Sequence, residues 1–318
     1  MLDVYFTIDA EIWCDGWHDL EQKFPEAFER YILGPGRRWG LPDQLQVLSD
    51  HGLRAVCFVE PLFAGRFGHA PLAEVVGLIQ DSDHEVQLHL HTEWVDEFLE
   101  PVLPTVVGKR QHLRQYNLAE QALLIATGSA WLQRAGASAP TAFRAGSFAL
   151  NLDSIAALAA NGIPIDSSYN ASIFGPNSGV CDGELLEQPR QLNAVLELPM
   201  TVFDDGRGLR HAQLTACSWR ELEHLLWQAL EQGHTSFVLL SHSFELLAPN
   251  QRAPDPTVVK RLQQLCSFLD RHRDSFCTRG LRESPPPRIP TAPPPRLRSS
   301  LWRTGARIAE QVWRQRYA

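Results

Sequence analysis

The amino-acid sequence predicts an α/β fold in which a parallel sheet or barrel is covered by helices. The main observation is that apolar segments of strand length alternate with amphipathic segments long enough for helices. A second observation is that polar residues gather where the predicted strands end, as at the active sites of such folds. The chain has 318 residues, of which 44% are hydrophobic, so it can bury a sizeable core.

The first half of the chain supplies three of the predicted strands. We expect strands over residues 2–9, 54–61 and 84–91, and helices over 19–32, 41–52, 71–83 and 111–135. The strand at 54–61 contains a continuous apolar run, AVCFV, as expected when both faces of a sheet are covered. Gly52 suits the end of the helix that precedes it.

The second half continues the alternation as far as residue 272. We expect strands over 140–146, 163–168 and 235–242, an apolar segment at 194–201, and helices over 152–162, 218–233 and 255–272. Residues 284–299 form a proline-rich linker that we expect to be extended. The chain is therefore predicted to consist of a domain over 1–283, this linker, and a helix over 300–318.

Composition excludes several classes of protein. The net charge of −8 argues against a nucleic-acid partner. The six cysteines form no CxxC pair, so no zinc-finger or thioredoxin motif is present. The N-terminal residues contain no basic segment followed by a long apolar run, so no signal peptide is expected. We therefore expect a cytoplasmic protein with reduced thiols.

The last 35 residues differ in charge from the rest. Residues 284–318 carry seven Arg and one Glu, whereas residues 1–283 carry 22 basic and 36 acidic residues. On a helical wheel the apolar residues of the final helix share one face, namely Leu301, Trp302, Ile308, Val312 and Trp313. The opposite face carries Arg303, Arg307 and Arg314. This pattern predicts peripheral contact with the inner face of a membrane or with a partner protein; docking on its own domain is the alternative.

Ionisable residues follow five of the predicted strands. They are Asp9, Glu11, His89, His91, Arg144, Asp166 and His242. A divalent metal in a hydrolase takes imidazole and carboxylate ligands, which His89, a third group and Glu11 or Asp9 would supply. Asp9 and His242 suit a general base and a general acid.

Two further residues of this set suit supporting tasks. Arg144 could keep a carboxylate ionised, with an ordinary structural ion pair as the alternative. Asp166 could orient His242, with a turn or helix cap as the alternative.

The segment HEVQLHLHTEW, residues 84–94, leaves the third metal ligand open. If the strand continues through residue 91, His89 and His91 lie on the same face and can share a metal. If the chain turns helical after residue 89, Glu93 comes under His89 instead. Zinc chemistry favours the second imidazole, with Glu93 as an outer or alternative ligand. His84, at the start of the strand, is expected to be structural.

The order of motifs resembles the polysaccharide deacetylase family, also called the NodB homology domain or carbohydrate esterase family 4. The motifs are FTIDAE, AVCFVEP, HEVQLHLHTEW, FRAG, IDSS and VLLSHSFE, and the resemblance covers roughly residues 1–283. It implies a distorted (β/α) barrel with about seven strands. It also implies a divalent metal, usually zinc, that serves to remove N- or O-acetyl groups from sugars.

The resemblance assigns roles to the metal-binding motifs. Asp9 is similar to the catalytic base, whereas Ala10 stands where the family usually has an aspartate ligand, so Glu11 takes that role. His89 matches the first histidine ligand. The second usually follows four residues later, where this chain has Glu93.

The later motifs receive the remaining roles. Arg144 resembles the arginine that orients the base, although Gly146 replaces the usual proline. His242 resembles the catalytic acid, and Leu240 an apolar residue that lines the acetyl pocket. Asp166 matches its motif only loosely.

These assignments predict a metal-dependent hydrolase that removes an N-acetyl or other N-acyl group from a sugar or glycan precursor. Without a signal peptide, its expected place is surface-polysaccharide biosynthesis. The alternatives are a related C–N hydrolase acting on a non-sugar amide, and a non-catalytic glycan-binding relative. A metal amidohydrolase is a more distant alternative, because such enzymes carry His-x-His on their first strand and here it lies at residues 89–91.

Overall fold

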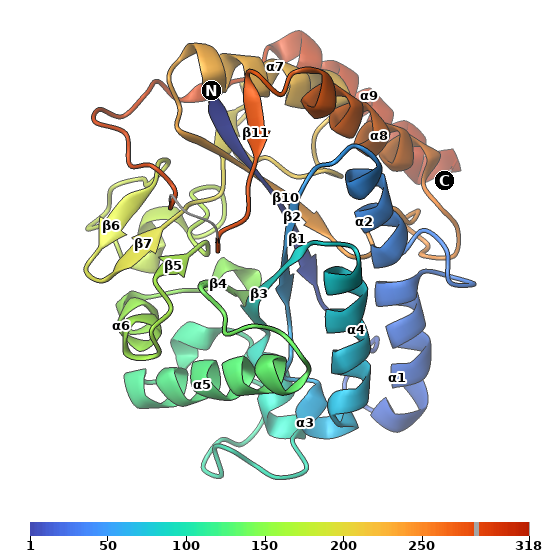
Figure 1. Cartoon of the computed structure of the whole chain (residues 1–318), viewed down its shortest axis with the longest axis vertical. Helices are drawn as coiled ribbons and strands as arrows, with labels where there is room; N and C mark the ends of the chain where they lie inside the picture. Colours follow the sequence, from blue (N-terminus) through green and yellow to red (C-terminus); the bar gives the residue numbers. More distant parts are fainter. Residues whose placement is uncertain (283–285, 318) are drawn as a thin grey trace.

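A curled parallel sheet forms the centre of the computed structural model, which describes residues 1–282 and 286–317 (Figure 1). The strand order is β10-β1-β2-β3-β4-β5-β7-β6, with β11 paired to β1. Within the described residues, the seven strands from β10 to β7 are parallel, and β6 is antiparallel to β7. The sheet is a half-barrel, which confirms the predicted distorted (β/α) barrel fold. Its strands are β1 (Leu2–Ala10), β2 (Ala55–Val59), β3 (Glu85–Leu90), β4 (Ala142–Ala145), β5 (Ile165–Asp166), β6 (Arg190–Leu192), β7 (Val195–Glu197), β10 (Ser236–His242) and β11 (Phe276–Thr278).

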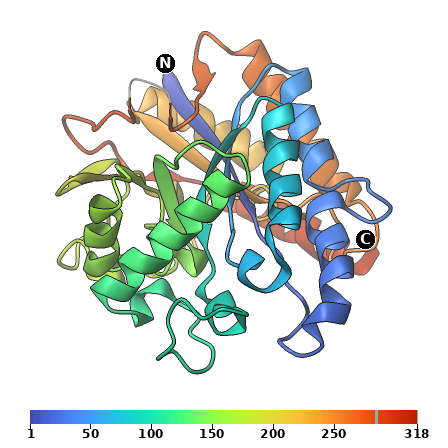
Figure 2. The same cartoon turned by 60° about the horizontal axis from the view of Figure 1, so that its bottom comes forward.

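Helices cover the convex side of the half-barrel (Figures 1 and 2). They are α1 (Leu20–Phe28), α2 (Leu41–Asp50), α3 (Ala64–Phe67), α4 (His69–Asp81), α5 (Leu118–Arg134), α6 (Leu152–Ala160), α7 (Trp219–Glu231), α8 (Pro256–Arg271) and α9 (Leu301–Tyr317). Short π or 3-10 turns occupy Glu29–Leu33, Thr92–Glu97, Leu113–Gln115, Gly146–Phe148 and Gly175–Ser178. Among the described residues, no helix combines the length and the apolar character needed to cross a bilayer.

Side-chain alternation along each strand separates two apolar clusters. On β1, Phe6 and Ile8 join the large core beneath the helices, whereas Tyr5 belongs to a smaller cluster on the concave side. On β3, Leu88 and Leu90 join the large core, which leaves His89 on the concave side. This alternation brings polar residues from the strand ends to one concave edge.

Most predicted elements are present, and the differences have local causes. The long helix begins at Leu118 and not near residue 111, because Asn117 caps it and accepts a hydrogen bond from the Glu120 amide at 3.0 Å. The strands absent from the prediction have two or three residues, too few to show periodicity. One lies in the proline-rich segment: β12 (Leu297–Arg298) pairs with β8 (Val202–Asp204), which in turn pairs with β9 (Leu209–His211).

Helix α9 packs on the body through the face predicted to be polar. Arg307 and Arg314 are 2% and 9% exposed, whereas Leu301 and Trp302 are 70% and 79% exposed. The helix therefore contacts the body through arginines, and the apolar residues at its start are exposed; the side chain of Trp313 lies outside the described part of the chain. The alternative of docking on its own domain holds. The division of the chain at residues 283 and 299 stays a prediction.

Buried acids of the body explain this reversal. Arg307 lies 2.8 Å from Asp205 Oδ2 and 3.1 Å from Glu221 Oε2, and both carboxylates are almost fully buried. A buried carboxylate is unfavourable without a cation and hydrogen bonds, which the helix supplies. The periodicity of α9 alone could not indicate this.

Arg307→Ala is expected to lower the free energy of unfolding by about 3–5 kcal/mol, because it removes the closest cation of two buried carboxylates; Asp205 then has Arg210 at 3.8 Å. Equilibrium unfolding in guanidinium chloride measures this loss. Arg303→Ala on the same helix is the matched control, since within the described residues the side chain of Arg303 has no carboxylate partner and donates to the Ser300 hydroxyl. Equal stability of the two variants would contradict the structural role of Arg307.

Candidate active site

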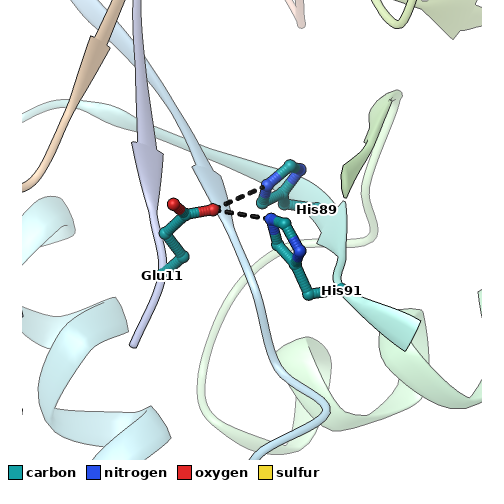
Figure 3. Close-up of side chains that lie close together, drawn as sticks. All are labelled: Glu11, His89 and His91. Atoms are coloured by element: carbon teal, nitrogen blue, oxygen red, sulfur yellow. Dashed lines mark hydrogen bonds and ion pairs between the residues drawn. The ribbon is translucent and has the colours of Figure 1, made fainter. Parts of the chain in front are cut away.

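Three predicted ligands come together at the concave edge of the sheet. Glu11 follows β1, His89 lies on β3 and His91 directly follows it; each offers a ligand atom, and these atoms lie within 4.8 Å of one another. Figure 3 shows both imidazoles directed at the carboxylate of Glu11. Glu11 Oε2 lies 2.6 Å from His91 Nε2 and 3.4 Å from His89 Nε2. All three side chains are buried.

The end of β3 distinguishes the two arrangements that the sequence left open. His91 has φ −100° and ψ 102°, so the chain is still extended there and turns into a 3-10 helix only at Thr92. His89 and His91 therefore share a face, with ring centroids 4.8 Å apart. Glu93 lies on the far side of the second imidazole, with its Oε2 3.4 Å from His91 Nδ1. In that position Glu93 is better suited to orient His91 from outside a metal site than to be the third metal ligand.

The tautomer of His89 follows from its partner. Its Nδ1 lies 2.8 Å from the carbonyl oxygen of Arg144, so this nitrogen carries the proton and donates. The lone pair of Nε2 then faces Glu11. Metal-binding histidines commonly have this arrangement, in which the second nitrogen is fixed by a carbonyl or carboxylate.

The electrostatics of the cluster suit a cation. Burial alone would raise the pKa of Glu11, but His91, His89 and His242 hold it well below its usual range. Burial would lower the pKa of His91, but Glu11 and Glu93 raise it to about 10. A proton held between a buried carboxylate and a buried imidazole occupies the place that a divalent cation can take. Two imidazoles and one carboxylate also form a known donor set of catalytic zinc.

Asp9 lies beside this cluster and is paired with Arg144. Arg144 is fully buried; its Nη1 donates to Asp9 Oδ1 at 2.6 Å, and its Nε donates to the carbonyl oxygen of Ser167 at 3.0 Å. The guanidinium also lies over the ring of Phe58. Such a fixed cation orients the carboxylate of Asp9, as a general base requires.

His242 lies opposite Asp9 in the pairing of β10 with β1. Its Nε2 is 4.0 Å from Glu11 Oε1, and its Nδ1 is 2.8 Å from Glu245 Oε1. Burial would lower the pKa of His242, but the hydrogen bond with Glu245 and the charge of Glu11 raise it to about 9. His242 is thus held in its protonated form, which a general acid requires.

Asp166 does not contact His242, as the sequence had suggested it could. It faces Glu197 from the neighbouring strand β7, and Ser168 Oγ donates to its Oδ1. Burial raises the pKa of both Asp166 and Glu197, so the two carboxyls share a proton. The carboxylate that contacts the imidazole is Glu245. A catalytic role of Asp166 stays a prediction.

Leu240 lies two residues before His242 on β10 and is 1% exposed. It belongs to the small apolar cluster on the concave side of the sheet, together with Phe148 and Met200. Its predicted place in an acyl-binding pocket is compatible with this cluster and stays a prediction.

Trp13 also contacts the cluster, although sequence reasoning did not select it. Its Nε1 donates to Glu11 Oε1 at 3.0 Å, and its ring packs edge-on against His91 with centroids 4.6 Å apart. In the sequence, only its position two residues after Glu11 could have indicated this contact. Glu245 is three residues after His242, in a loop whose course periodicity does not predict.

Comparison with known proteins finds similarity in structure only. No protein-family model matches the sequence, and no curated protein matches it. The fold is similar to that of a Mycobacterium smegmatis protein proposed to be a polysaccharide deacetylase. The identity is 16% over 88% of this chain and 87% of that one, with a TM-score of 0.56.

Two further similarities are more distant. A family 4 carbohydrate esterase from Streptomyces lividans in complex with acetate is 15% identical over 91% of this chain and 97% of that one, with a TM-score of 0.44. A CE4 family pseudoenzyme from Bacillus anthracis is 10% identical over 87% and 63%, with a TM-score of 0.39. At these identities the similarity concerns the fold: the chain has the fold of the polysaccharide deacetylase-like protein of Mycobacterium smegmatis.

Proposed function

We propose that the protein is a metal-dependent hydrolase of the polysaccharide deacetylase family that removes an N-acetyl or other N-acyl group from a sugar. The observation that carries this proposal is one buried edge holding three kinds of group. These are a potential metal cluster of Glu11, His89 and His91, a carboxylate fixed by an arginine, and an imidazole fixed by a carboxylate. Amide hydrolysis needs an electrophilic cation, a base and an acid together.

The residues divide the reaction between them. A divalent metal bound by the cluster, most suitably zinc, would polarise the acyl carbonyl and acidify a water molecule. Asp9, held by Arg144, accepts the proton of the attacking water. His242, held by Glu245, donates its Nε2 proton to the nitrogen of the departing amine as the C–N bond breaks. The products are the free carboxylic acid and an amino sugar.

Acetate release tests this proposal. The protein, dialysed against zinc, is incubated with N-acetylglucosamine oligomers, and acetate is measured together with free amines. Release that depends on both the metal and His242 is the expected result. A stoichiometric metal without any release from N-acylated sugars would point to the alternative of a non-sugar amide. The absence of metal binding would favour a non-catalytic relative.

The sugar is proposed to be a glycan precursor of surface-polysaccharide biosynthesis, handled in the cytoplasm. This place in metabolism stays a prediction. Comparing acetate release from sugar nucleotides, lipid-linked sugars and finished polymer would test it. A preference for finished polymer would contradict this place in metabolism.

Contact with an anionic membrane is also proposed, through the exposed start of α9. Trp302 lines a groove of about 590 Å³ together with Arg220 and Lys260, and among the described residues neither cation has an acidic partner. Exposed cations near an anionic bilayer contribute about 1 kcal/mol each, and an adjacent tryptophan can enter the interface.

We expect co-sedimentation with vesicles that contain anionic lipid, and its loss in Leu301→Ser/Trp302→Ser. Neutral vesicles are the control. This test is sharper than deleting residues 284–318, because deletion also removes the buried ion pairs of Arg307. Equal binding of the wild type and the double variant would remove this surface from the proposal.

A further inference from the structure

The loop before α7 is held by side chains from the two last helices. The carbonyl oxygens of three successive residues, Leu214, Thr215 and Ala216, accept hydrogen bonds from outside the loop. Arg261 of α8 donates to the first. Arg314 of α9 donates to the second at 3.3 Å, and Gln311 of α9 donates to the third, also at 3.3 Å.

Arg314 is itself fixed. Its Nε donates to Asp255 Oδ2 at 2.6 Å; Asp255 is fully buried, and its other oxygen caps the start of α8. A guanidinium that joins a buried carboxylate to a backbone carbonyl has a single favourable position. The end of α9 therefore determines where the Thr215 carbonyl lies.

The same loop holds Glu245. The Thr215 amide donates to Glu245 Oε2 at 3.1 Å, and Gln213 Nε2 donates to its Oε1. The Oε1 atom in turn lies 2.8 Å from His242 Nδ1. A continuous series of contacts thus runs from Arg314 through Thr215 and Glu245 to the imidazole of His242.

These residues also share a cavity. A space of about 270 Å³ is lined by Thr215, His242, Glu245 and Arg314, together with residues of the loop after β10. The C-terminal helix therefore lines the cavity beside the His242 imidazole through Arg314. The segment that connects this helix to the body was predicted to be only a linker.

We propose that Arg314 and Gln311 are positioning residues for the catalytic acid His242, so that the C-terminal helix completes the active site. This inference rests on the proposed function, since it assumes that His242 protonates the departing amine. The helix acts through the 213–216 loop and Glu245 and does not touch the reacting atoms.

Two substrates separate this role from a purely structural one. Hydrolysis of an N-acetylated sugar needs a proton on the leaving nitrogen, whereas 4-nitrophenyl acetate releases a stable phenolate without one. Misplacement of His242 should therefore slow the first reaction and spare the second. General acid catalysis contributes about 10²–10⁴-fold, and misplacement forfeits part of it.

For Arg314→Ala we expect kcat on the N-acetylated sugar to fall by about ten- to a hundredfold, with KM and ester hydrolysis changed by less than about threefold. Arg314→Lys should recover part of the loss, since it keeps a donor near Asp255. Glu245→Gln should give the same pattern. Its effect should not add to that of Arg314→Ala, because both act through one series of contacts.

Arg303→Ala is the matched control on α9 and should leave both reactions unchanged. If Arg314→Ala does not fold, Gln311→Ala takes its place, since this change removes a neutral hydrogen bond that α9 donates to the same loop. Equal loss of both reactions, or loss of neither, would overturn the positioning role. A wild type that hydrolyses neither substrate would instead refute the proposed function.

Discussion

Asp9→Asn is expected to reduce kcat for the release of an acyl group by about 10²–10⁴-fold, the contribution of a general base. The amide keeps the shape of the carboxylate and can still accept from Arg144 Nη1, which donates to Asp9 Oδ1 at 2.6 Å. It cannot take the proton of the attacking water. Steady-state kinetics on an N-acetylated sugar measures the loss.

Metal content is the control for this variant. Asp9 lies outside the cluster of Glu11, His89 and His91, so Asp9→Asn should bind as much metal as the wild type. Loss of metal with activity would show that Asp9 is a ligand. Activity within about threefold of the wild type would refute its role as base, and with it the division of tasks between Asp9 and His242.

The residues that gather at the concave edge could be predicted because the alternation of side chains along a strand depends only on the local sequence. Once the chain is extended near residue 89, His89 and His91 must share a face, and Asp9 and Glu11 must do so for the same reason. Parallel strands then bring these faces to the same edge of the sheet, so residues from different strands are expected to lie close together there. The fold and the histidine pair therefore followed from the sequence.

The partners of these residues were not predictable in the same way. Glu245 contacts His242 from the loop after β10, and it accepts from the 213–216 loop, which α9 contacts from far along the chain. The orientation of α9 depends on buried acids of the body, such as Asp205, and not on its own apolar pattern. Both are nonlocal effects that periodicity does not record.

Two differences from the motifs of the family that the sequence resembles explain each other. Gly146 stands where a proline is usual, and His91 stands two residues before Glu93, which occupies the usual position of the second histidine. A Cβ atom on residue 146 would lie 2.7 Å from His91 Nδ1 and 2.7 Å from the Leu90 carbonyl oxygen. Only glycine leaves room for the imidazole here, so the two changes belong together.

Metal binding should distinguish His91 from Glu93. His89→Ala and His91→Ala each remove a ligand, and we expect neither variant to retain stoichiometric zinc after dialysis. Glu93→Gln removes only the charge beside His91 Nδ1, at 3.4 Å, so zinc affinity should fall by about 10–100-fold, as for a residue that orients a ligand. Competition with a chromophoric chelator measures these affinities.

Gly146→Ala adds a test that does not touch any ligand. Its new methyl group must displace the His91 imidazole, so zinc affinity should fall although every ligand is still present. Gly77→Ala is the matched control, since Gly77 in α4 likewise has no positive φ but has open space where the new methyl group would lie. If Glu93→Gln lost zinc completely while His91→Ala and Gly146→Ala kept it, the third ligand would be Glu93 and not His91.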